Sequence, residues 1–445
     1  MNAAAPAVSR RWWSQVPRLK QIAELISRQQ GEILACLGTF SAPAVNLVYG
    51  LLVFRYLTPS LAGILSTAML LPSYLMFAHG GVLNGMQREL PFALGQGDRT
   101  KADHLLRITS TIALLAGGAS AFACLVAALI AWTTGKPPLL ALAYIGAAFT
   151  SFAFPVVMQI DTGLRAENRF RRQGWAVLNT NAVSLAACAL LPALGATGAV
   201  LRGIVAGAAS LLLRLRSGVW SPALPVDWSG TLALARTGWP LLASATLGGW
   251  MMIADRSVVS LLMSDEAMGE FQLAGFIVNS MSMVPVSLSL VLFPKIARAY
   301  GEHRSRRKLR RFVWISLAFN AATLLPLSGI TYLVIEPLVL RFFPKYAAGI
   351  PSAHIACLTC VFWIYAGAGS VIGVTNRMTP YLITLGVSLA LIWTGAAWLI
   401  HSGYGINGAA WARLAGTVLM CVFTVGYSLY LTSRDDEPAE VNGGT

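Results

Sequence analysis

An aspartate and an arginine stand side by side in the apolar stretch GGWMMIADRSVVSLLM, residues 248–263. Asp255 and Arg256 could bind an anion, carry a proton or form ion pairs within the protein. Ionisable side chains inside an apolar segment are costly, so they are usually paired or functional. Which chemistry they perform depends on the solvent around the segment, and therefore on the elements that position them.

The composition places these residues in a membrane. Of the 445 residues, 56% are hydrophobic and 11% are charged, whereas a soluble domain carries about 25% charged residues. Apolar blocks recur along the chain, and each is long enough to cross the hydrocarbon core as a helix. The sequence therefore predicts an all-α polytopic membrane protein without a large soluble domain. The six cysteines lie in apolar runs, which indicates packing rather than a disulfide or a metal site.

Twelve membrane-spanning helices are predicted from the apolar blocks. They are placed at 32–57, 61–84, 107–133, 138–160, 174–195, 198–215, 238–262, 269–293, 309–334, 350–373, 379–401 and 408–431. The chain then divides into a cytoplasmic basic arm (1–30), a six-helix bundle (31–216), a cytoplasmic linker (217–237), a second six-helix bundle (238–432) and a disordered cytoplasmic tail (433–445).

The lysines and arginines predict the orientation. With the N-terminus in the cytoplasm, 26 of the 33 fall in the arm, the tail and the loops on the cytoplasmic side. This asymmetry predicts that both termini are cytoplasmic. The formal charge of +15 is therefore explained by the lysines and arginines of the cytoplasmic loops. Because the basic residues are confined to short loops, no nucleic-acid partner is expected.

An internal repeat relates the two halves of the chain. The segment LTPSLAGILSTAMLL resembles LMSDEAMGEFQLAGF, so Gly63 corresponds to Gly269 at an offset of 206 residues. Further on, Gly97 corresponds to Gly301 at an offset of 204 residues. Six spans separate the copies, so both halves keep the same orientation. Parallel repeats of this kind bind substrate between the halves and favour alternating access.

Four segments carry a family resemblance: GGVLNGMQRELPFALGQGD, ADRSVVSLLMSDEAMGEFQLAGF, LVLFPKIARAYGE and HSGYGINGAAWARL. In order and spacing they resemble the Wzx-type polysaccharide flippases of the multidrug/oligosaccharidyl-lipid/polysaccharide exporter superfamily. The resemblance covers most of residues 30–432. It implies two six-helix bundles forming a V around a central cavity. It also implies transport of undecaprenyl-pyrophosphate-linked oligosaccharide to the outer leaflet, for O-antigen, capsule or exopolysaccharide assembly.

Such a substrate requires a hydrated cationic cavity, because its pyrophosphate is charged while its tail stays in lipid. Arginine suits this role, since its planar fork binds phosphate oxygens and stays protonated. We therefore expect Arg256 to bind phosphate or sugar, with Asp255 orienting it or carrying a proton. The alternative is an Asp–Arg network that pins the seventh span to a neighbour. Helical spacing would place Asp255 in one stripe with Gly248 and Met251, and Arg256 in the stripe beside it.

Several weaker candidates accompany this pair. Arg202 and Arg413 lie inside spans six and twelve, where they either face the cavity or extend to the outer interface. Arg88 closes the second span beside Glu89 and either gates substrate entry or forms an interfacial ion pair. Arg55 lies near a helix end, where an interfacial role competes with substrate binding. The basic cluster at 304–311 is expected to contact anionic lipid headgroups, with docking of a glycosyltransferase or a polymerase as the alternative.

Other functions fit less well. No catalytic outer loop and no nucleotide-binding glycine-rich loop are apparent, so neither an enzyme nor a cofactor is predicted. An ion-coupled drug exporter of the same superfamily is the nearest rival, but the interior of the first span has Asn46 and Tyr49 and no carboxylate. A lipid II flippase usually has fourteen spans, according to the family resemblance. A scaffold of the polysaccharide machinery would need no polar cavity.

Overall fold

The computed structural model describes residues 17–303, 306–375 and 377–433, and these residues form helices joined by short turns. The first half contains α1 (Pro17–Tyr56), α2 (Pro59–Leu75), α3 (Val82–Gly95), α4 (Arg99–Thr133), α5 (Pro138–Ala166), α6 (Phe170–Ala186) and α7 (Leu190–Leu215). The second contains α8 (Trp228–Met251), α9 (Ala254–Leu262), α10 (Asp265–His303), α11 (Arg306–Phe342), α12 (Ile350–Val361), α13 (Gly369–Val374), α14 (Met378–Leu399) and α15 (Gly405–Ser433).

The helices account for the twelve predicted crossings. Seven stretches are by themselves long and apolar enough to span a membrane, and two of these, 46 and 56 residues long, each contain a chain reversal. They therefore supply nine crossings. The broken helices α2–α3 and α8–α9, together with α10, supply the other three. The prediction of an all-α polytopic membrane protein is confirmed.

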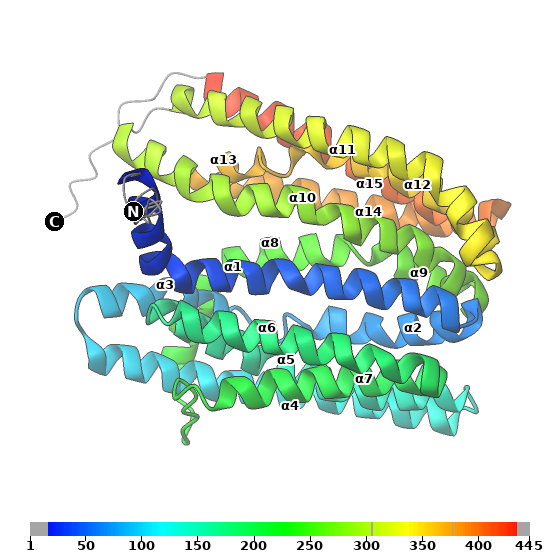
Figure 1. Cartoon of the computed structure of the whole chain (residues 1–445), viewed down its shortest axis with the longest axis horizontal. Helices are drawn as coiled ribbons and strands as arrows, with labels where there is room; N and C mark the ends of the chain where they lie inside the picture. Colours follow the sequence, from blue (N-terminus) through cyan, green and yellow to red (C-terminus); the bar gives the residue numbers. More distant parts are fainter. Residues whose placement is uncertain (1–16, 304–305, 376, 434–445) are drawn as a thin grey trace, which may run out of the picture.

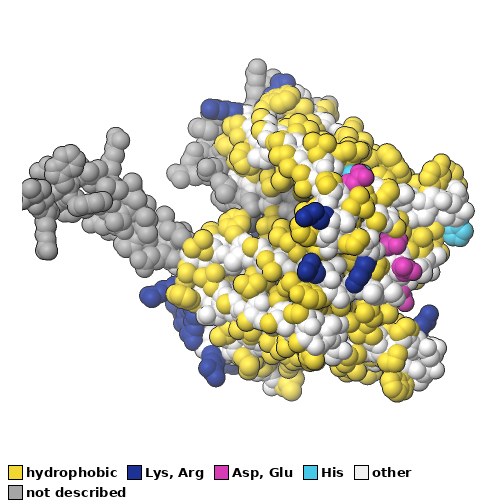
Figure 2. Space-filling model, turned by 45° about the vertical axis from the view of Figure 1, so that its right-hand side comes forward, with side chains coloured by type: hydrophobic (Ala, Val, Ile, Leu, Met, Phe, Trp, Pro, Cys, Tyr) yellow, Lys and Arg dark blue, Asp and Glu magenta, His cyan; other side chains and the backbone are white. Residues whose placement is uncertain are grey.

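The helices form two lobes that lie side by side (Figure 1). The N lobe consists of α1–α7 and the C lobe of α8–α15. Helix α1 begins and α15 ends at one end of the molecule, which we call the termini end; the opposite end is the loop end (Figure 1). Hydrophobic side chains cover most of the face in Figure 2, as contact with lipid requires, and its acidic side chains lie toward the loop end.

Two predicted boundaries differ from the structure. Helix α1 begins at Pro17 and so extends into the predicted arm, while residues 1–16 of the arm and 434–445 of the tail lie outside the described residues. The linker is shorter than predicted because α8 begins at Trp228. Asp227 caps α8 by accepting a hydrogen bond from the Gly230 amide at 3.0 Å. This bond, together with hydrogen bonds from Ser229 and His104, lowers the pKa of its carboxyl to about 2.

The repeat is visible in the backbone. Thr58 caps α2 and Ser264 caps α10, each accepting from the amide three residues ahead, and the two lie 206 residues apart. Gly195 and Gly405 both have φ of 55°, with ψ of −132° and −141°, at equivalent reversals. Only glycine adopts this conformation without strain. The second predicted correspondence differs, because Gly97 lies in the α3–α4 turn whereas Gly301 lies inside α10.

The lobes pack against each other at the loop end. There the first turns of α2 and α10 cross backbone to backbone, so a Cβ at Gly63 would overlap the Asp265 carbonyl and a Cβ at Gly269 the Pro59 carbonyl. A single hydrophobic core joins the lobes at this end and includes Phe54, Phe271 and Tyr346.

Two further hydrophobic clusters lie toward the termini end. One surrounds Met86 and Ile160, and the other surrounds Ile296 and Val313. Helix α8 crosses over here: its Leu234 belongs to the first cluster, and it packs against α3 where Gly81 and Gly85 allow close approach. The lobes lie farther apart at this end (Figure 1). The molecule is thus closed at the loop end.

Candidate functional site

Asp255 forms a buried ion pair, and its partner is Arg413 on α15. Nη1 of Arg413 lies 2.7 Å from both carboxylate oxygens of Asp255. The two residues are 2% and 4% exposed. Asp255 is thus part of an Asp–Arg pair that joins the seventh span to a neighbouring span, as one of the two predicted alternatives required. Its partner is Arg413 and not the neighbouring Arg256. Arg413 does not extend to the outer interface, which was one of its two expected placements.

The seventh span is broken beside this pair, contrary to the continuous helix that the stripes of Gly248, Met251 and Asp255 assumed. Helix α8 ends at Met251, Ile253 has non-helical dihedrals, and α9 begins at Ala254. A glycine pair at 248–249 precedes the break, which is a common cause of a sharp kink. Nη1 of Arg413 donates to the freed Met252 carbonyl at 3.1 Å. Asp255 lies in the first turn of α9, where the helix dipole favours a negative charge.

Arg256 has no carboxylate partner in the described part of the chain. Its guanidinium lies against Gly275 of α10, where a Cβ would come within 2.5 Å of Nη2. Its Nε is buried and makes no hydrogen bond to a described residue. The side chain as a whole is only partly buried. A guanidinium in this position has donors available for a ligand.

Arg202 occupies the equivalent region of the N lobe. Its guanidinium carbon lies 3.9 Å from the centre of the Tyr49 ring, a cation–π contact between α7 and α1. Tyr49 precedes Asp255 by 206 residues, the offset that also relates the two helix caps. An aromatic ring thus stands in the N lobe where the C lobe has a carboxylate. Nε of Arg202 also makes no hydrogen bond to a described residue.

The remaining predicted residues lie apart from this group. Arg88 is exposed on α3 and Arg55 is exposed near the end of α1 at the loop end. The structure therefore brings Asp255 and Arg413 together, with Arg256 adjacent in sequence, but it does not gather all six candidates in one place. Asn181 of α6 is used in helix packing against α1, because its side-chain amide donates to the Gly38 carbonyl at 2.9 Å and to Ser41 Oγ at 2.7 Å.

One buried ionic group was missed by the sequence analysis. Nε of Arg214 donates to Asp161 Oδ1 at 2.8 Å, and its Nη1 donates to Thr180 Oγ1 at 3.2 Å, joining α5, α6 and α7. Asp161 falls one residue beyond the predicted span 138–160, but α5 continues to Ala166, and Arg214 lies near the end of both the predicted span 198–215 and α7. The pair was not predicted because both charged residues lie close to the ends of apolar runs, where charges are common.

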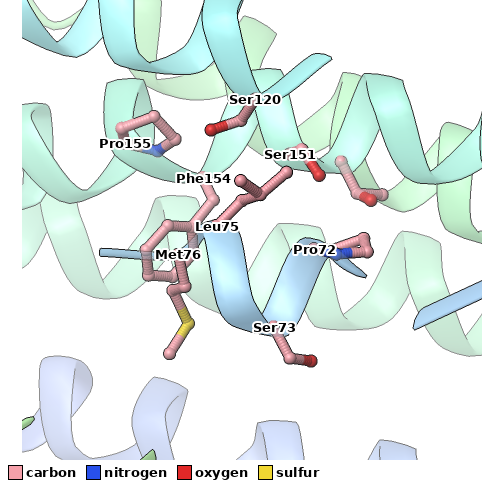
Figure 3. A pocket seen from close by; sticks show the side chains of 9 residues that line it. Pro72, Ser73, Leu75, Met76, Ser120, Ser151, Phe154 and Pro155 are labelled. Carbon is pink, nitrogen blue, oxygen red and sulfur yellow. The ribbon is translucent and has the colours of Figure 1, made fainter. Parts of the chain in front are cut away.

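A small cavity of about 180 Å³ lies in the N lobe beside the point where the second span breaks. Pro72 and Leu75 of α2 face Ser120 of α4 and Ser151 of α5 across it (Figure 3). Its lining contains no ionisable residue. Since nothing charged faces it, the cavity is a poor site for a pyrophosphate.

The fold is similar to that of solved transporters of the multidrug/oligosaccharidyl-lipid/polysaccharide superfamily. An inward-facing multidrug MATE transporter of this superfamily matches with a TM-score of 0.74 and 15% identity, over 89% of this chain and 98% of that chain. An outward-facing MATE structure gives 0.64 at 15% identity, over 90% and 94%. A superfamily transporter from Pyrococcus furiosus gives 0.60 at 15% identity, over 91% and 96%. At these identities the likeness establishes the fold alone.

A comparison with protein families gives a more specific assignment than the fold does. The profile of the family described as polysaccharide biosynthesis protein matches residues 52–346, which is more than half of the chain. The chain belongs to this family. A comparison with curated proteins gives no match. The predicted resemblance to polysaccharide transporters of this superfamily is confirmed.

Proposed function

We propose that this protein is a flippase that moves undecaprenyl-pyrophosphate-linked oligosaccharide from the cytoplasmic to the outer leaflet of the bacterial inner membrane. Membership of the polysaccharide biosynthesis family supports a saccharide substrate. The two-lobe transporter fold supports movement across the membrane. The flipped units are assembled into a surface polysaccharide such as O-antigen, capsule or exopolysaccharide.

The observation that carries the proposal is an excess of positive charge inside the spans. Arg202, Arg256 and Arg413 lie in the interiors of three spans, and only Arg413 is paired with a carboxylate, Asp255. A charge inside a membrane span is costly unless it is paired. An anionic ligand would supply the missing charge, and an arginine fork suits the oxygens of a pyrophosphate. Arg256 and Arg202 are therefore the proposed headgroup ligands, with Asp255 positioning Arg413 rather than carrying a proton.

Transport proceeds by alternating access between two arrangements of the lobes. The head enters from the termini end, where the clusters around Met86 and around Ile296 are separate, and the prenyl tail remains in lipid. The closed α2–α10 crossing at the loop end then opens to release it. The greater similarity to an inward-facing transporter supports this assignment of the present state. Arg88 would meet the substrate on entry and Arg55 on exit.

The orientation and partners follow from the same proposal. Both termini face the cytoplasm, as the distribution of lysines and arginines predicts. The basic segment 304–311 binds anionic headgroups, although residues 304–305 lie outside the described part of the chain. A polymerase or glycosyltransferases could dock at the same surface.

A drug exporter is the second candidate, because the similar solved structures include multidrug transporters. The apolar window Leu34–Tyr56 of the first span contains no carboxylate for ion coupling. Unpaired arginines also repel cationic drugs. Both observations favour an anionic substrate.

Deletion of the gene tests the proposal. Lipid-linked repeat units should accumulate on the inner leaflet, and surface polysaccharide should be lost. Complementation with the wild-type chain should restore both. If surface polysaccharide persisted in the deletion strain and only drug sensitivity rose, the drug-exporter function would replace the flippase.

A further inference from the structure

A second cavity lies inside the C lobe, and it differs in kind from the uncharged cavity of the N lobe. Its volume is about 190 Å³, enough for roughly six waters at ~30 Å³ each. Three aromatic residues line it: Trp363 and Tyr365 from the segment between α12 and α13, and Tyr381 from α14. Arg413 completes the lining from α15.

Interrupted helices surround this cavity on two sides. The α8–α9 break contributes Met252, and the tenth span loses its α-helical form over Phe362–Tyr365, where it becomes a 3₁₀ turn. Irregular backbone within a membrane protein is tolerated where it is buried in protein or lines a polar cavity. Ligand sites in transporters are commonly built from such discontinuous helices. The interruption of two separate spans at one cavity therefore indicates a binding site.

The lining also offers polar groups that no described residue satisfies. The hydroxyls of Tyr365 and Tyr381 and the indole N–H of Trp363 make no hydrogen bond within the described part of the chain. Arg413 is 4% exposed, and its Nη1 donates hydrogen bonds to Asp255 and to the Met252 carbonyl. Its Nε is also buried, but it makes no hydrogen bond to a described residue. Flat apolar faces bordered by a few hydrogen-bonding groups are the usual composition of a small-molecule site.

Charge and size decide the class of ligand. Asp255 already neutralises Arg413, so the cavity does not attract a pyrophosphate, while the guanidinium disfavours a cation. An uncharged pyranose ring meets both requirements of charge. Its C–H face stacks on aromatic rings, and its hydroxyls bond to tyrosine, indole and guanidinium groups. The cavity has about the volume of one hexose.

We propose that the C-lobe cavity binds one pyranose ring of the transported head, apart from the pyrophosphate ligands Arg256 and Arg202. This inference rests on the proposed flippase function. Two parts of the substrate are then bound separately. Arg256 and Arg202 bind the pyrophosphate, which all lipid-linked substrates share, and the cavity recognises one sugar. Substitutions in the cavity should then alter which repeat units are accepted.

Saturation-transfer NMR on the purified full chain tests this directly. The protein is kept in a detergent that contains no sugar, and the probes are glucose, galactose, N-acetylglucosamine and glucuronate. At least one should receive saturation from the wild-type protein. Trp363→Ala should weaken its binding about tenfold, which corresponds to ~1.4 kcal/mol. Tyr381→Phe, which removes only a hydroxyl, should weaken it less. The matched control is Trp398→Ala, which changes an exposed tryptophan of α14.

Two results would overturn the inference: none of the four sugars binds the wild-type protein, or Trp363→Ala and Tyr381→Phe both bind as the wild type does. A cellular readout separates it from the proposed function. If deletion abolishes surface polysaccharide but both variants export it at the wild-type rate and composition, the sugar site is wrong and the flippase stands. If deletion leaves polysaccharide intact while the sugars bind, the flippase is wrong.

Discussion

At the scale of single residues, the two neighbours Asp255 and Arg256 have different roles. Asp255 is held by Arg413 across 158 residues of sequence, whereas Arg256 keeps its donors free of described carboxylates. Adjacent residues on a helix point about 100° apart, so different surroundings are expected for them. The sequence could indicate that both residues matter, but it could not reveal Asp255's partner, because a contact over 158 residues depends on the packing of α9 against α15.

The first prediction concerns Arg256. Arg256→Ala should reduce transport per folded molecule roughly ten- to hundredfold, because hydrogen bonds to a charged ligand contribute about 1.5–3 kcal/mol. Arg256→Lys should recover only part of this, since a point charge replaces a bidentate fork. Export of surface polysaccharide is measured against protein abundance in the membrane. Arg236→Ala, at an exposed position of α8, is the control, and equal transport in both variants would refute the ligand role.

The second prediction concerns the buried pair. Arg413→Ala leaves the Asp255 carboxylate without a counterion, which should cost about 3–5 kcal/mol of stability. The double variant Asp255→Ala/Arg413→Ala should be more stable than Arg413→Ala, because no charge is then left unpaired. Thermal midpoints in detergent measure both. If Asp255→Asn remained stable but abolished the dependence of transport on the pH gradient, Asp255 would carry a proton and the positioning role would be wrong.

At the scale of elements, the apolar runs predict the existence of the spans well but not their interruptions. Gly248 and Gly249 precede the break in the seventh span, yet the pair Gly117 and Gly118 lies within the unbroken helix α4. Only the structure shows that Arg413 bonds the carbonyl freed at Met252. The end of α5 differs from the predicted one, because Asp161 resembles a loop charge until its pairing with Arg214 is seen.

The third prediction addresses the crossing of α2 and α10. Gly63→Ala should weaken closure of the loop end, because the added Cβ would overlap the Asp265 carbonyl and backbone cannot yield cheaply. Spin labels at the loop end of the two lobes should report longer distances in the variant. Gly118→Ala on α4 is a matched control, since open space surrounds that position. Unchanged distances in Gly63→Ala would show that this crossing does not set the closed state.

At the scale of the whole molecule, the two lobes repeat one plan with different charges. The C lobe pairs an arginine with Asp255, while the N lobe places Arg202 on the Tyr49 ring. The repeat itself could be read from Gly63 and Gly269, because both are required for one crossing. The direct contact between the two segments could not be predicted, since an offset in sequence does not say how the two halves are placed relative to each other.

The fourth prediction concerns orientation. Reporter fusions at Lys136, Lys345 and Gly405 should all report the outer side, because each lies at a turn of the loop end and the basic loops lie at the other end. A fusion after Ser433, the last residue of α15, should report the cytoplasm. A cytoplasmic signal from any of the first three would invalidate the topology and the direction of transport derived from it.

Reconstituted transport tests the central claim most directly. Purified protein is placed in liposomes that contain an undecaprenyl-pyrophosphate-linked oligosaccharide, and the fraction of its sugar that is accessible to external periodate is followed with time. Wild-type protein should bring the inner-leaflet pool to the outer surface, Arg236→Ala should do the same, and Arg256→Ala should be slower by roughly ten- to hundredfold. If the wild-type protein left the inner pool protected, as in protein-free liposomes, the flippase account would be contradicted.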